Sequence, residues 1–270
     1  MEKIALPKKI EFKQNGNINE SLVIVEPLYP GYGNTIGNTL RRVLLSSLPG
    51  SAVVGVKIKG AKHEFMALPG IKEDILDIVL NLKQLKIKIL SDTEDILKLE
   101  LNVQGKKVVT AKDIKKDSQV EIINSDLVLA TITDQVGSLG MEIYVANGRG
   151  YLLPEKNKKD GKDVDYMEID SIYTPVVGVS YKVENVRVGK MTNWDKLVLD
   201  IKTNGTISVE DAFNQSVQIL IDQFNALTTL KDIEKLEDAS AVAVEEIIAP
   251  ETKEEIKTKK KTAKTGKDKK

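Results

Sequence analysis

Apolar residues recur along the chain with two different spacings, and these spacings predict its helices and strands. Three stretches repeat every three or four residues, as in an amphipathic helix: Ile36 to Ser47, Ile71 to Leu82 and Phe213 to Leu227. Other stretches, such as Leu97 to Val103, alternate apolar and polar residues, which is typical of half-buried strands. The sequence therefore predicts an α+β protein in which antiparallel sheets carry a few helices.

The first predicted helix follows a glycine-rich turn. Gly31 and Gly33 suit a turn because glycine accepts positive φ, and Asn34 or Thr35 is expected to cap the helix. A proline and a glycine at positions 49 and 50 are expected to end it. Its apolar stripe consists of Ile36, Leu40, Val43 and Leu44, closed by the small polar Ser47.

Two adjacent arginines, Arg41 and Arg42, interrupt this helix. Successive side chains lie about 100° apart around a helix, so at least one guanidinium points away from the apolar stripe. A guanidinium is a forked donor suited to a carboxylate or a phosphate. The pair fits either a docking site for a partner or an ordinary solvated pair of charges, and the pattern alone leaves both open.

The glycines of this turn also resemble part of a dinucleotide-binding loop. The third glycine of G-x-G-x-x-G is missing, because position 36 is isoleucine. About 20 residues further on, the segment Ala52 to Ile58 has no carboxylate for a ribose hydroxyl. A glycine-loop nucleotide-binding protein is therefore kept only as an alternative function, and no cofactor is expected.

The last predicted helix runs from Val209 to Leu230, after a capping-box pattern at Ser208 and Asp211. Its apolar residues step by 4, 3, 4 and 3, which is the seam of a coiled-coil-like contact. The seam consists of Phe213, Val217, Leu220, Phe224 and Leu227. Its partner is either the first helix of the same chain or the same two helices of a second copy, and periodicity does not decide between them.

Composition excludes several classes of protein. The 270 residues include no cysteine, so disulfides and thiolate chemistry are excluded, and the one histidine, His63, is expected to be structural or solvated. No apolar run approaches the roughly 18 residues of a membrane span, and the first residues lack a signal core. Acidic residues between 155 and 165 do not match a calcium loop. We expect a cytoplasmic protein without catalytic or metal-binding residues.

The carboxy-terminal part of the chain separates its charges. Residues 234–256 hold eight acidic residues and two lysines, a net charge of −6, whereas residues 257–270 hold eight lysines and one aspartate, a net charge of +7. Residues 233–270 lack a periodic pattern and are predicted to be a disordered tail. Weak attraction to DNA and a merely solubilising role both remain open, and a tail-mediated nucleic-acid-binding protein is a further alternative function.

The order of these segments resembles the amino-terminal portion of the alpha subunits of bacterial-type DNA-directed RNA polymerase. The resemblance covers about residues 1–232. It is carried by GYGNTIGNTLRRVLLSSLPG (Gly31 to Gly50), GIKEDILDIVLNLK (Gly70 to Lys83), NGRGY (Asn147 to Tyr151), YTPV (Tyr173 to Val176) and DKLVLDIKTNGTI (Asp195 to Ile207).

The resemblance implies a homodimer that serves as the assembly scaffold of a nucleotidyltransferase, and that has no active site of its own. Residues 1–50 and 178–232 are expected to form the dimerisation subdomain, and residues 51–177 an inserted sheet subdomain. DNA contact is expected only indirectly or weakly, because the family's usual carboxy-terminal domain is not expected after residue 232. The expected dimer interface comprises Ile36, Leu40, Val43, Leu44, Phe213, Val217, Leu220, Phe224 and Leu227.

The resemblance also implies contacts with the two large subunits of the polymerase that carries out transcription. Arg42, beside Arg41 and Leu45, falls on the position that the family uses against the beta subunit. Lys83 and Ile169 fall on positions used against the beta prime subunit. An exposed cation at Lys83 suits such a contact, since charged rims steer partners and fix their register.

Overall fold

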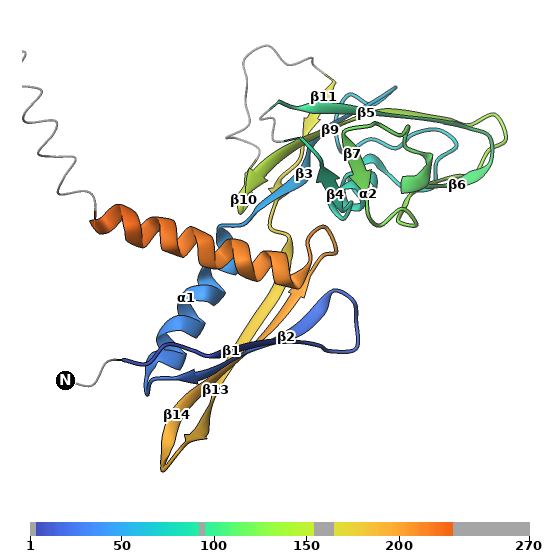
Figure 1. The fold of residues 1–270 in the computed structure, drawn as a ribbon. Coiled ribbons are helices and arrows are strands. Elements are labelled where there is room, and N and C mark those ends of the chain that lie inside the picture. The colour runs from blue at the N-terminus through green and yellow to red at the C-terminus, as the bar shows by residue number, and fades with distance from the viewer. Residues whose placement is uncertain (1–3, 92–94, 154–164, 229–270) are drawn as a thin grey trace, which may run out of the picture. The chain divides into compact units, whose positions relative to one another are not determined.

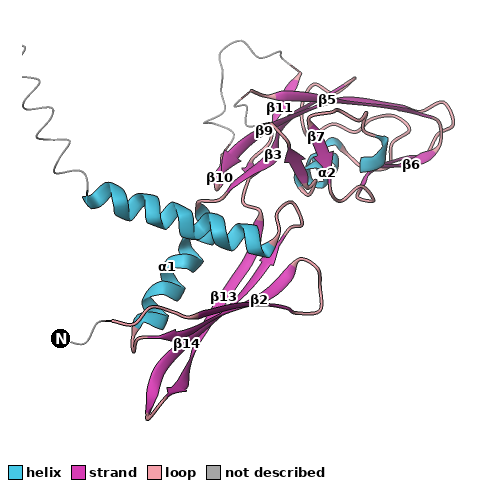
Figure 2. Cartoon of the chain, viewed as in Figure 1, coloured by secondary structure: helices cyan, strands magenta, loops and turns pink. Residues whose placement is uncertain are grey.

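The computed structural model describes residues 4–91, 95–153 and 165–228. Within them it contains antiparallel sheets and three α-helices, so the predicted mixed fold is confirmed (Figures 1 and 2). The predicted tail and nearly all of the charged loop at 155–165 lie outside the described residues. The elements are β1 (Lys9–Gln14), β2 (Glu20–Leu28), α1 (Tyr32–Ser46), β3 (Pro49–Ile58), α2 (Ile75–Lys83), β4 (Ile87–Ile89), β5 (Leu97–Gln104), β6 (Lys107–Thr110), the short 3-10 helix η1 (Ala111–Asp113), β7 (Val120–Ile122), β8 (Val128–Ile132), β9 (Ser138–Arg149), β10 (Tyr151–Leu152), β11 (Tyr166–Glu168), β12 (Ser171–Ile172), β13 (Val176–Val188), β14 (Met191–Thr203) and a helix at 209–228.

Residues 1–217 form one compact unit, and residues 218–228 are the described part of a second one. The boundaries expected near residues 50 and 178 stay a prediction. The first unit contains a four-stranded sheet in the order β1-β2-β14-β13, and strands from both ends of the sequence meet in it (Figure 1). Its hairpin between β1 and β2 turns at Gly16, whose φ is 79°, and an Asn-Gly step such as Asn15-Gly16 is typical of a hairpin turn.

Alternation gives the four-stranded sheet two different faces. Leu197, Leu199 and Ile201 of β14 are fully buried, and α1 lies on this face, in contact with β13 and β14. The opposite face carries charged residues, with ion pairs such as Lys196 to Glu184 at 3.2 Å. Exposed pairs of this kind contribute little to stability, and the neighbouring Val198 and Ile24 on this face are each 7% exposed.

The larger sheet has the order β5-β9-β3-β4-β7, with β11 paired to β3. It forms a hydrophobic core together with α2, of which Ile75, Ile78 and Leu82 are fully buried. The period-two pattern at 97–103 forms β5, which pairs along its whole length with β9. The sequence pattern thus predicted both this sheet and the one-sided helix that packs on it.

Two predicted boundaries were wrong. Helix α2 begins at Ile75 rather than Ile71, because Ile71 bridges to Ile132 and Asp74 caps the helix by accepting a hydrogen bond of 2.8 Å from the backbone N–H of Asp77. The glycines of Asn147 to Tyr151 predict a tight turn over this segment, and the observed turn is shorter. Strand β9 continues through Arg149, and only Gly150, with φ of 67°, has the left-handed conformation.

Candidate docking surface

The first turn of α1 is held by a carboxylate that lies more than 160 residues later in the chain. The backbone N–H groups of Gly31 and Gly33 both donate to Oδ2 of Asp195, at 2.9 and 3.0 Å. Asp195 lies on β14 and is only 7% exposed. The expected caps were wrong, because the helix already begins at Tyr32 and neither Asn34 nor Thr35 caps it. This carboxylate occupies the position that a nucleotide phosphate would take, which argues against the nucleotide-binding alternative.

The glycine spacing in α1 is explained by close packing against the sheet. A Cβ atom at Gly33 would lie 2.8 Å from Cγ1 of Val183, and one at Gly37 would lie 2.7 Å from Cδ2 of Tyr181. Real Cβ atoms do not approach other atoms so closely, so these two residues let the helix backbone lie directly on β13. The glycine pattern that resembles a nucleotide loop therefore serves helix packing.

The apolar stripe expected on α1 is divided between two faces. Leu40 and Leu44 are 3% and 0% exposed and, with the two glycines, form the face that packs on the sheet. Their surface is already buried within the chain, and their place in the expected dimer interface stays a prediction. Ile36 and Val43 are half-buried on the neighbouring face, where Tyr32, which the sequence pattern missed, is 41% exposed.

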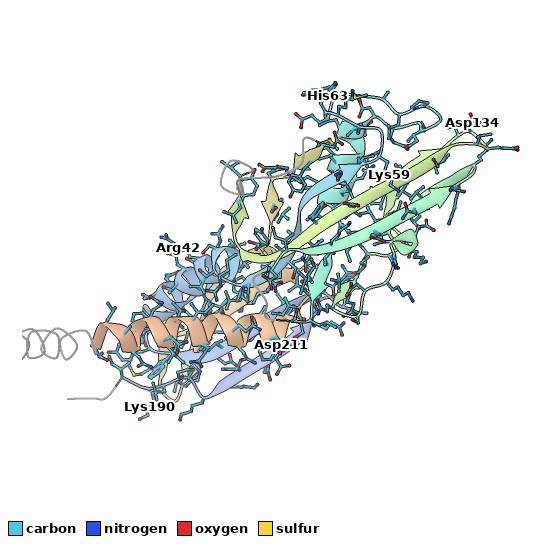
Figure 3. All side chains as sticks on the ribbon, turned by 90° about the horizontal axis from the view of Figure 1, so that it is seen from above. Arg42, Lys59, His63, Asp134, Lys190 and Asp211 are labelled. Carbon is cyan, nitrogen blue, oxygen red and sulfur yellow. The ribbon has the colours of Figure 1, made fainter. Side chains whose placement is uncertain are left out.

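Arg41 and Arg42 lie on a third, exposed face of α1. Within the described residues, neither guanidinium has an ion-pair or hydrogen-bond partner, and Figure 3 shows Arg42 on the outer side of the helix. Leu45, one turn further along, is 36% exposed. The three residues together present two forked donors beside a small apolar contact. Such a combination suits a protein partner that carries carboxylates.

The carboxy-terminal end of α1 contacts one residue of the YTPV segment, which is held in turn by the NGRGY segment. The hydroxyl of Thr174 donates to the carbonyl of Leu45 at 3.3 Å, and the N–H of Tyr173 donates to the carbonyl of Gly150 at 2.9 Å. The ring of Tyr173 lies against Gly148, where a Cβ would be 2.7 Å from its Cζ atom. The Thr174 contact joins the end of α1 to the segment before β13, and the Tyr173 contacts hold that segment against the end of β9.

Lys83, at the end of α2, is not a free cation. Its Nζ atom pairs with Oδ2 of Asp170, and the hydroxyl of Tyr151 donates to the same oxygen at 2.7 Å. The Lys83 side chain is 27% exposed, so it contributes a partly covered charge to the surface. Ile169 is 2% exposed and belongs to the hydrophobic core, so its side chain offers no surface to a partner. The expected contact at Ile169 stays a prediction, and the side chain of its neighbour Asp170 is 28% exposed.

The pair of Lys83 with Asp170 makes stability depend on pH. Burial raises the pKa of Asp170, but the hydrogen bonds from Lys83 and Tyr151 outweigh burial, and the pKa lies below its ordinary value. A lowered pKa means that the pair stabilises the fold above about pH 4, and that this contribution is lost as pH falls through the folded-state pKa. We expect wild type to be more stable than Asp170→Asn in urea at pH 6 and the difference to shrink at pH 3. A difference that grows on acidification would contradict this assignment.

The helix at 209–228 begins in the first unit and ends in the second. Phe213 is 5% exposed and meets the ring of Phe12 edge-on at 5.8 Å. It therefore belongs to the core of its own chain, and its place in the expected interface stays a prediction. In residues 218–228, Leu220 is half-buried, whereas Phe224 and Leu227 are 61% and 66% exposed. The seam predicted from the sequence thus ends in exposed apolar residues.

The remaining expectations concern the lone histidine, metal binding and membrane spans. His63 is exposed in the loop between β3 and α2. The described residues contain no group of three or more acidic or histidine side chains that would hold a metal ion. No helix in the same residues has the length and apolarity to cross a membrane.

Comparison with known proteins identifies the family. Residues 56–174 match the RNA polymerase Rpb3/RpoA insert domain. Over 238 residues the chain is 50% identical to the DNA-directed RNA polymerase subunit alpha of Desulforamulus reducens, an alignment that covers 87% of this chain and 75% of that protein. At this identity and coverage, the nucleotide-loop and tail-only alternatives lose their support. The chain belongs to the family of DNA-directed RNA polymerase alpha subunits.

Proposed function

We propose that this chain is the non-catalytic assembly subunit of the polymerase, a homodimer that binds the beta and beta prime subunits. The single observation that carries this proposal is the exposed face of Arg41, Arg42 and Leu45 on a helix fixed at both ends. A rigid element with unpaired guanidinium groups gives a partner a defined orientation at little entropic cost. We assign this face to the beta subunit.

The exposed apolar residues of α1 and of the last helix support a dimer. Tyr32 and Ile36 lie on a face of α1 that the sheet does not cover, and Phe224 and Leu227 are exposed at the end of the last helix. Exposed apolar patches of this kind are favourable in an interface and unfavourable in water. The symmetric partner for two such helices is the same pair in a second copy.

The surface around Lys83 is the proposed contact for beta prime. Lys83, Asp170 and Tyr151 form a connected polar group. Next to it, Ile172 pairs with Tyr151 across β10 and β12, and both residues are more than half exposed. A charged cluster beside an apolar pair resembles a polar rim around a small contact centre.

We expect Arg42→Ala to weaken capture of the beta subunit by about thirtyfold, since truncating an arginine anchor typically costs about 2 kcal/mol. Homodimerisation is expected to stay unchanged, because Arg42 lies off the apolar face. The measurement is co-purification of a tagged full-length chain with the beta subunit, quantified over a concentration series.

Arg187→Ala is the matched control for this experiment. Arg187 is also exposed, and among the described residues its Nε atom bonds only to the carbonyl of Gly189 in its own turn. It should capture the beta subunit as wild type does. Equal capture by Arg42→Ala and wild type would remove the proposed role of Arg42.

A further inference from the structure

The amino-terminal end of α1 has no carboxylate of its own. Its first turn contains no acidic residue, and no side chain of the same segment caps it. A helix leaves its first N–H groups without partners inside the helix, and its dipole favours negative charge there. In this chain both needs are met by Asp195, which lies 162 residues after Gly33.

The residue before Asp195 holds the same end of the helix through aromatic contacts. The ring of Trp194 meets that of Tyr29 edge-on at 5.9 Å, and Tyr29 meets Tyr32 edge-on at 6.0 Å. Two consecutive residues of β14 thus fix both the backbone and the first side chain of α1. Aromatic pairs in this geometry contribute beyond their buried area.

This attachment lies next to the face proposed for dimerisation. Tyr32 is the first residue of α1, and Ile36 follows about 6 Å along the axis at 1.5 Å per residue. Arg42 lies more than two turns away, near the end that Thr174 fixes through the carbonyl of Leu45. Loss of the carboxylate is therefore expected to loosen the dimer face more than the arginine face.

We propose that Asp195 is a positioning residue for dimerisation, which holds the first turn of α1 so that Tyr32 and Ile36 face a second copy of the chain. This inference rests on the proposed homodimer. It assigns a role in assembly to a buried carboxylate that lies far in sequence from the helix that it caps.

The experiment compares full-length Asp195→Ala and Asp195→Asn with wild type. Asp195→Ala should raise the dimer dissociation constant about tenfold, because two hydrogen bonds to a charged acceptor are lost. Asp195→Asn keeps an acceptor oxygen and should stay within about threefold of wild type. Sedimentation well below the melting temperature measures both constants, and amide hydrogen exchange at Gly31 and Gly33 reports the hydrogen bonds directly.

Asp74→Ala is the matched control, because Asp74 caps α2 through the N–H of Asp77 and lies away from the proposed interface. It should lose stability without a change in the dissociation constant. If Asp195→Ala speeds exchange at Gly31 and Gly33 but leaves dimerisation unchanged, the positioning role is wrong. Dimerisation as weak in Asp195→Asn as in Asp195→Ala would also contradict it. A wild-type chain that is monomeric throughout would overturn the homodimer itself, and the exchange data would still show whether the cap exists.

Discussion

A chain carrying Phe224→Asp and Leu227→Asp is expected to be a folded monomer. Both side chains are more than half exposed, so the charges are solvated in the monomer. In a two-fold dimer the pair occurs twice, and each apolar side chain contributes about 2 kcal/mol when it is buried. Unpaired carboxylates add a further cost in the interface. Together these effects should raise the dissociation constant about 1,000-fold or more, as measured by sedimentation.

The matched control is Gln223→Asp, which adds one negative charge at an exposed position directly before Phe224. It should dimerise as wild type does. Phe213→Asp, in contrast, does not probe the interface, because residue 213 is buried against Phe12 and a carboxylate there would unfold the chain. A double variant that remains dimeric would contradict the use of this helix in the interface.

Gly37→Val is expected to destabilise the fold by about 3 kcal/mol, at the upper end of the usual cost of overpacking. A Cβ at this position would lie 2.7 Å from the ring of Tyr181 and 2.8 Å from Cδ1 of Leu197, so α1 must move off the sheet. For a folded unit of this size the melting temperature should fall by about 10 °C. Calorimetry of the full chain measures this change.

Gly178→Val is the control for overpacking, because no atom lies within 4 Å of a Cβ built at Gly178 and the residue belongs to strand β13. A β-branched residue suits a strand, so this variant should keep the wild-type melting temperature. Similar melting temperatures for the two variants would show that α1 does not depend on close approach at Gly37.

The helices and sheets could be predicted from the sequence because their apolar periodicity is strong. The pattern around α1 shows which residues are apolar, but not which of two neighbouring faces the sheet covers. Leu40 and Ile36 therefore looked equivalent in the sequence, although one is buried and the other half-exposed. Periodicity cannot resolve this difference, because it depends on where glycines allow the sheet to approach.

The polar contacts were harder to predict than the fold. The carboxylate of Asp195 and the helix that it caps are separated by more than 160 residues. No rule of local spacing connects them. Likewise, Lys83 looked like a free cation because its partner, Asp170, lies 87 residues away. In both cases the family resemblance includes the segments that contain these residues. It does not reveal the hydrogen bonds and ion pairs between the segments.

The attachment of α1 at both ends has a consequence for how this protein is recognised. Gly33 and Asp195 hold one end of the helix, whereas Gly150 and Thr174 lie in the group that holds the other, and all four fall within the stretches that resemble the polymerase family. Much of the sequence that identifies the family therefore consists of residues that hold helix α1 in place. A related protein that kept these attachment residues and lost Arg42 would still be assigned to the family, although it would lack the residue proposed to bind the beta subunit.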